Sequence, residues 1–250
     1  MIWMIAKREF KNLFISPIAW ILLSVFQIIM AYLFLSQLDQ YLYWQPQLAG
    51  LQGAPGATDI IAAPLLQTAG FIVLWIVPAI TMRTLSEEQR NGTMPLLVSS
   101  PVTGTDIILG KFTGILLFFF VLLILLMAMP VSLYAGTAMD TGKLLSGAIG
   151  LALLFSAFTA VGIYMSSLTE QPIIAAVSTF GILLFLWIID WSQGAREDVS
   201  GLFHYLSLQT HLDSFIRGLF STTDLMYYLL IIAVALMLAI RRLDNKRLSG

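Results

Sequence analysis

The stretch that decides the fold is DIILGKFTGILLFFFVLLILLMAM, residues 106–129, an apolar run long enough to cross a bilayer as one helix. Its Leu, Ile and Phe residues do not alternate with polar ones, which argues against a strand of a membrane barrel. The bilayer core offers the backbone no hydrogen-bonding partners, so the segment must satisfy its own polar groups. The stretch is therefore predicted to be a transmembrane helix.

Five further stretches share this character. The chain of 250 residues is 58% hydrophobic and 11% charged, with a mean hydropathy of +0.88, whereas soluble domains are about 25% charged. Without cysteine it has neither disulfides nor thiolate metal sites. The sequence predicts an all-α polytopic membrane protein, a single domain over residues 1–250 with six transmembrane helices. The predicted spans, which lack a central Asp, Glu, Lys or Arg, are residues 17–38, 60–82, 106–129, 144–168, 173–191 and 224–240.

The distribution of cations predicts the orientation. Of the 13 Lys and Arg residues, only Lys143, Arg196 and Arg217 fall on the side opposite the termini. The other ten are Lys7, Arg8, Lys11, Arg83, Arg90, Lys111, Arg241, Arg242, Lys246 and Arg247. The positive-inside rule then places both termini and the loop 83–105 in the cytoplasm. On this topology the triplet Asn91-Gly92-Thr93 faces the wrong compartment for glycosylation.

Residues 1–16 are predicted to form an amphipathic elbow helix that lies flat on the cytoplasmic leaflet. Its cations, across from the apolar arc, place it near anionic headgroups, and Ser16-Pro17 turns the chain into the first span. Glu9 lies within the apolar arc and is the one misfit. The alternative is a simple extension of the first span that Pro17 kinks. The apolar arc contains Ile2, Trp3, Ala6, Phe10, Leu13 and Phe14, and Lys7, Arg8, Lys11 and Asn12 lie opposite.

The longest outer loop, residues 192–223, is predicted to contain a short helix lying against or dipping into the membrane surface. Helical spacing relates Leu208, Leu212, Phe215, Ile216 and Leu219. A metal site could be read from His204, His211 and Asp213, but two imidazoles seven residues apart supply too few converging donors. A packing or substrate-exit role is favoured, and no metal is expected. The other outer loop, 39–59, is interpreted as an ordinary connection.

The interiors of the spans argue for an energy source outside the chain. Ion-driven transporters usually place ionisable groups within the membrane, whereas here the mid-span polar residues are Gln27, Gln67, Thr68, Ser156 and Thr159. Two small-residue seams favour intramolecular helix packing over a dimer contact. They consist of Ala148, Ala152, Ser156 and Ala160, and of Gly110 and Gly114.

Enzyme motifs are missing from the sequence. It contains neither His-Glu-x-x-His nor Gly-x-Ser-x-Gly. The run 104–111 imitates a phosphate loop, but its glycine spacing is wrong and Phe112 replaces the magnesium-binding Ser or Thr. No catalytic, cofactor-binding or metal-binding residue is therefore expected on this chain.

The stretch EEQRNGTMPLLVSSPV, residues 87–102, is the one patterned polar interruption between two long spans. Thr93 can cap a short helix that begins at Met94-Pro95, and Pro101 would end it. Leu96 and Leu97 would give this helix an apolar patch, which needs a partner when it faces water. The stretch is therefore predicted to be a docking site for another protein.

This pattern, acidic-acidic-x-Arg-x-Gly-Thr-x-x-Leu-Leu-x-Ser-x-Pro-Val followed by Leu109-Gly110-Lys111, resembles the coupling region of the type-2 ABC exporter permeases. It is most similar to the gliding-motility (GldF-like) and NosY-like permeases. The outer pattern His211-Leu212-x-x-Phe215-x-Arg217-Gly218 is also similar to that subgroup. Pro95 departs from the pattern, because relatives commonly carry an acidic residue there, which removes any basis for a charged contact at this position.

The resemblance implies a permease subunit of an ATP-driven exporter in the bacterial inner membrane. A separate ATP-binding subunit would hold the ATP and Mg, and the permease would pair with a second copy or a homologue. Besides membrane lipid, a periplasmic auxiliary protein is left open, and no nucleic acid is expected. The implied coupling contacts are Glu87, Glu88 and Arg90 at the rim and Met94, Leu96 and Leu97 as anchors, in a segment shaped by Gly92, Thr93 and Pro101.

Two other functions remain open at this point. A secondary transporter would have to run on an ion gradient without an ionisable group in its spans. A non-transporting membrane scaffold or assembly subunit could use the same loop to bind a partner that lacks nucleotide-binding motifs.

Overall fold

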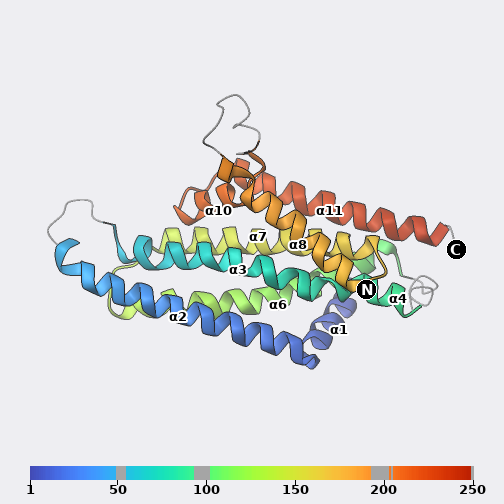
Figure 1. Ribbon diagram of the computed structural model, residues 1–250, viewed down its shortest axis with the longest axis horizontal. Coiled ribbons are helices and arrows are strands. Elements are labelled where there is room, and N and C mark those ends of the chain that lie inside the picture. The colour runs from blue at the N-terminus through green and yellow to red at the C-terminus, as the bar shows by residue number, and fades with distance from the viewer. Residues whose placement is uncertain (49–54, 93–101, 193–202, 204, 249–250) are drawn as a thin grey trace.

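The computed structural model describes residues 1–48, 55–92, 102–192, 203 and 205–248, and within these ranges all regular secondary structure is helical (Figure 1). Successive long helices run in opposite directions. Both termini therefore lie at one end of the bundle, on the right in Figure 1, which is called here the termini end. The helices are α1 (Ile2–Ile15), α2 (Pro17–Leu48), α3 (Ala63–Thr81), α4 (Arg83–Arg90), α6 (Gly104–Ser132), α7 (Thr141–Leu168), α8 (Pro172–Ile188), α10 (Leu208–Ile216) and α11 (Thr222–Leu248). Short π or 3-10 turns are η1 (Thr58–Ala62), η2 (Leu133–Ala135) and η3 (Ile189–Ser192).

Five helical stretches of the described chain are long and apolar enough to cross a membrane. They are Pro17–Gln47, Thr58–Arg90, Gly104–Ala135, Thr141–Leu168 and Thr222–Lys246. The predicted span 173–191 corresponds to α8, whose 17 apolar residues fall short of that length. The positions of all six predicted spans thus coincide with helices.

Helix α2 is longer than predicted, and the interpretation of 39–59 as an ordinary connection is wrong in its first part. The helix continues to Leu48 because the next proline after Pro17 is Pro46, which comes only in the last turn. Leu38 and Tyr41 pack against the core, which supports the extra turns. At the other end of the chain, α11 likewise continues past the predicted boundary at 240.

The first helix is separate from the first span. Ser16 has extended backbone angles, φ −73° and ψ 129°, so α1 ends at Ile15 and α2 begins at Pro17. Proline suits the first turn of a helix because its missing N–H would have no partner there. The alternative of a continuous helix kinked at Pro17 is therefore excluded.

Helix α7 is the centre of the bundle, in contact with α3, α6, α8, α10 and α11. Two hydroxyl groups in its middle are satisfied within the helix, since Ser156 donates to the Ala152 carbonyl at 2.7 Å and Thr159 to the Phe155 carbonyl at 2.7 Å. Ala160 is fully buried. Small side chains and internally bonded hydroxyls thus let neighbouring helices approach α7 closely.

The predicted short outer helix is present as α10 and packs on the bundle. Phe215 lies over Gly150, where an added Cβ would be 2.6 Å from the Phe215 Cβ, and Leu212 lies over Gly70. Gly150 is nine residues into α7, so α10 sits about 13 Å from the start of that helix. The predicted apolar face is buried at four of its five positions. Leu219 is the exception at 63% exposure, because α10 ends at Ile216.

Gly150→Ala is expected to destabilise the protein by about 1–3 kcal/mol, because the new methyl group overlaps Phe215 in a packed interface. The measurement is the thermal unfolding midpoint of the detergent-purified protein. Gly181→Ala, on α8, is the matched control, since nothing lies within 4 Å of its added Cβ. Equal midpoints for the two variants would contradict this packing.

Candidate functional site

Helix α4 forms the polar continuation of α3 at the termini end, and Ser166 of α7 fixes the turn between them. The Ser166 hydroxyl accepts hydrogen bonds from the backbone N–H groups of Leu85 (3.0 Å) and Ser86 (3.1 Å). It donates to the Met82 carbonyl at 3.1 Å. One hydroxyl therefore uses its donor and both acceptor sites at the helix junction. Thr81, in the preceding turn, lies directly against Gly162 of α7.

Lys111 joins three helices at the same end. Its side chain, on α6, is only 2% exposed, and Nζ lies 2.9 Å from Oε1 of Glu9 on α1 and 2.7 Å from Oε1 of Glu88 on α4. A buried ammonium is costly unless counter-charges compensate for its lost hydration. The two carboxylates supply that compensation. We call this cluster the Glu9–Lys111–Glu88 triad.

Two glycines of α6 bring α1 close enough to form the triad. A Cβ added at Gly110 would lie 2.7 Å from the Ile5 Cβ, and one added at Gly114 would lie 2.7 Å from the Glu9 Cβ. Ala6, between them on α1, is fully buried. The glycine pair predicted as a packing seam is thus used within the chain, where it seats α1 on α6. Trp3, predicted on the apolar arc, is instead 67% exposed.

Gln89 ties α4 to two further helices. Its Nε2 donates to the Ser167 carbonyl at the end of α7 at 3.3 Å. Its Oε1 accepts from Nζ of Lys246 on α11 at 2.7 Å. Together with the triad and Ser166, these bonds connect α4 to α1, α6, α7 and α11.

The chain re-enters the bundle at an equally defined point. Thr103 caps α6, because its side-chain oxygen accepts from the Asp106 N–H at 3.1 Å while its hydroxyl donates to Asp106 Oδ2 at 2.7 Å. Gly104 lies against the carboxylate of Asp244 on α11. The segment between α4 and α6 therefore has both of its ends anchored.

Two cavities flank α4. One of about 350 Å³ lies between α1, the start of α2, the end of α3, α4 and α6. The other, about 680 Å³, lies between α4 and the turn before α8, where Glu87 and Arg90 line one side and Glu170 and Ile173 the other. Arg83 and Glu87 line both cavities.

Four of the predicted coupling residues lie in the described part of the chain. Glu87 and Arg90 are exposed, and Gly92 has a positive φ of 68° just after α4 ends. Glu88 differs from the prediction of a rim contact, because its side chain is only 20% exposed and bonded to Lys111. Thr93, Met94, Leu96, Leu97 and Pro101 lie outside the described residues.

The elbow residues fall into two groups. Lys7, Arg8 and Lys11 are exposed, while Phe10 is half-buried and its ring packs at a tilt of 54° against Phe14, with centroids 4.8 Å apart. Sequence reasoning missed the triad, although both of its signals were present. Glu9 was a misfit in an apolar arc, and Lys111 was a cation just inside an apolar span.

Two polar residues of the predicted outer segment have partners on other helices. His211 Nδ1 is 2.6 Å from Asp224 Oδ1 and Nε2 is 2.8 Å from the Tyr205 carbonyl, so both ring nitrogens have protein partners. Asp213 accepts from Gln67 Nε2 at 3.0 Å, and burial raises the pKa of its carboxyl. The described residues contain no group of three candidate metal ligands, and His204 lies outside them. Gly218 adopts a φ of 82° after α10.

The sequence that forms this helical bundle matches a known family. The family model of the ABC-2 family transporter proteins matches residues 3–248. The chain belongs to this family. An ABC-2 chain is the membrane subunit of an ABC transporter, a multi-pass protein that normally pairs with an ATP-binding subunit. No curated protein matches the sequence.

Removing the cation of the triad is expected to destabilise this ABC-2 protein strongly. Lys111→Met leaves the carboxylates of Glu9 and Glu88 without their shared counter-charge, at a cost of about 3–5 kcal/mol. The triple variant with Glu9→Gln and Glu88→Gln should recover much of that loss, because no buried charge then remains. Thermal unfolding midpoints measure both effects.

Lys7→Met is the matched control for this series, because Lys7 is an exposed lysine of α1. It should leave the unfolding midpoint unchanged. A triple variant no more stable than Lys111→Met alone would contradict the electrostatic account of the triad.

Proposed function

We propose that this chain is the membrane subunit of an ATP-driven exporter and that the segment 83–105 is where a separate ATP-binding subunit docks. The observation that carries the proposal is the anchoring of α4, whose bonds reach α1, α6, α7 and α11. When a partner displaces a docking segment that is bonded to four helices, those helices move with it. A loop attached only through its two chain ends could move without displacing the bundle.

The proposed topology places the termini end in the cytoplasm. The cation count supports it, because ten of the 13 Lys and Arg residues belong to that side. Six crossings follow if α8 spans together with η3, whose lengths of 17 and 4 residues give about 30 Å of helix. Helix α1 then lies at the level of the inner headgroups as the elbow helix.

The proposed transmission begins when ATP draws the two ATP-binding subunits together. Leu96 and Leu97 are the apolar anchors of the docked segment, and Glu87 and Arg90 make charged contacts beside the larger cavity. Glu88 has a different part from the one implied by the family pattern. Through Lys111 it carries the movement of α4 to α6 and to Glu9 on α1. Such a rearrangement shifts the bundle between two states of access.

The remaining parts of the proposal rest on family resemblance. The chain would belong to the gliding-motility and NosY-like subgroup and lie in the bacterial inner membrane. It would pair with a second copy or a homologue, and the pair would transport substrate outward. ATP and Mg belong to the partner subunit, because the sequence contains no phosphate-binding motif.

Replacing Leu96 and Leu97 with Asp is expected to abolish docking, because two carboxylates would have to be buried in an apolar groove without partners. Co-purification of the ATP-binding subunit and the ATP turnover of the complex are the measurements. Leu219→Asp is the control, since this leucine is 63% exposed and lies after α10, far from α4. Unchanged co-purification and turnover in the Leu96/Leu97 variant would refute the proposal.

Glu9→Gln is expected to leave docking intact and to reduce the response of α1. Because the chain has no cysteine, spin labels can be placed at Lys11→Cys and Leu219→Cys without background labelling. ATP should change the distance between the labels in the otherwise unmodified complex. In Glu9→Gln the change should shrink while co-purification persists, because the link from Lys111 to α1 is weakened.

Lys7→Met serves as the control for this measurement, since it alters the charge of α1 outside the triad. An undiminished ATP-dependent distance change in Glu9→Gln would show that α1 is moved by other contacts.

A further inference from the structure

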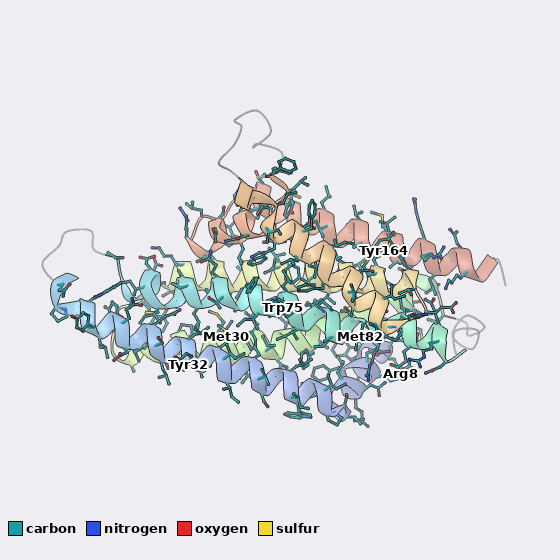
Figure 2. The ribbon with its side chains drawn as sticks, in the orientation of Figure 1. Arg8, Met30, Tyr32, Trp75, Met82 and Tyr164 are labelled. Carbon is teal, nitrogen blue, oxygen red and sulfur yellow. The ribbon has the colours of Figure 1, made fainter. Side chains whose placement is uncertain are left out.

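The smaller cavity beside α4 has the mixed charged and apolar lining of a site for an amphipathic molecule. Figure 2 places Arg8 of α1 and Met82, at the end of α3, at the same end of the bundle. The charged residues of the lining include Arg8, Arg83 and Glu87. Its apolar residues are Leu13, Ile18, Ala19, Ala79, Ile80 and Ile115.

The cavity lies at the depth of lipid headgroups if α2 crosses the bilayer. Ser16, Ile18 and Ala19, where α1 meets α2, line it, and the next residue is Trp20, whose indole N–H donates to the Phe14 carbonyl at 2.8 Å. Trp20 is 54% exposed, and Trp side chains gather at the membrane–water interface. Farther along α2, Ile21, Val25 and Ile28 are 59%, 48% and 69% exposed, a surface suited to an acyl chain.

The charges of the cavity match a headgroup that carries both signs. Lys111 is already held by Glu9 and Glu88. Arg8 and Arg83 present exposed guanidinium groups, which are well suited to phosphate oxygens. Arg8 keeps only a long contact with Glu9, at 3.8 Å. Exposed Glu87 offers a carboxylate to an ammonium group.

The size of the cavity restricts what can enter. About 350 Å³ is near the lower end of small-molecule sites, so it can hold a headgroup but not the acyl chains as well. The chains would have to leave along the exposed face of α2. We propose that this cavity binds the headgroup of one phospholipid with a primary ammonium, phosphatidylethanolamine, with its phosphate at Arg8 and Arg83 and its ammonium at Glu87.

The test is native mass spectrometry of the full chain, delipidated in detergent and without its ATP-binding subunit. It is titrated with phosphatidylethanolamine, phosphatidylcholine and phosphatidylglycerol of identical acyl chains. We expect one phosphatidylethanolamine molecule to bind about tenfold more tightly than phosphatidylglycerol, because charge-assisted bonds to the ammonium are lost in the latter. Glu87→Gln should remove the preference for phosphatidylethanolamine over phosphatidylcholine, whose methylated ammonium cannot donate hydrogen bonds.

The double variant Arg8→Gln/Arg83→Gln should weaken phosphatidylethanolamine binding about tenfold. Lys7→Gln/Lys11→Gln carries the same change in charge at exposed positions of α1 that do not line the cavity, and should change affinity less than twofold. Ala79→Leu fills the cavity without altering charge, and it should reduce binding even if the arginine variant fails to fold.

Phosphatidylglycerol binding as tight as phosphatidylethanolamine would overturn the proposal, because the ammonium would then contribute nothing. Equal losses in the arginine and lysine variants would overturn it as well, since binding would then depend on overall charge. The measurement is made on the permease alone, so its outcome is independent of where the ATP-binding subunit docks.

Discussion

A lysine ammonium almost wholly removed from water needs counter-charges, and this need organises the termini end of the protein. Lys111 obtains them from Glu9 on α1 and Glu88 on α4, two helices that are far apart in the sequence. Removing one member of such a buried set lowers the free energy of unfolding strongly, because another charge is then left buried without compensation. The position of α4 therefore depends on α1 being in place.

Hydropathy predicted the positions of the long helices because crossing a bilayer imposes a minimum apolar length on each of them. Hydropathy did not predict the helical turns that extend beyond the apolar spans. The extra turns of α2 beyond residue 38 lie past the predicted span, and their polar residues, such as Asp39 and Gln40, resemble a loop in composition. The periodicity of α10 correctly identified its apolar face. It could not tell whether protein or lipid covers that face, since Leu212 and Phe215 suit both.

The sequence predicted where the candidate site lies along the chain, but not which side chains contact each other in it. The polar stretch after the second span located α4, and its pattern suggested that Glu88 faces a partner protein. Glu88 and Lys111 are 23 residues apart, and Glu9 and Lys111 are 102 apart. A single sequence carries no signal of contact across either separation. Ser166 illustrates the same limit. A serine near the end of an apolar helix gives no indication in the sequence that it will accept hydrogen bonds from the backbone of another helix.

The seating of α1 on Gly110 and Gly114 also has a consequence for biosynthesis. The first helix leaves the ribosome long before its partner surface exists, since 102 residues separate Glu9 from Lys111. At about 5–20 residues per second, α1 waits about 5–20 s for α6. During that interval its apolar face and Glu9 have neither the glycine groove nor the ammonium group. If α1 lies on the membrane surface, as proposed, its amphipathic character lets it remain there until α6 is made, whereas a purely apolar helix would insert.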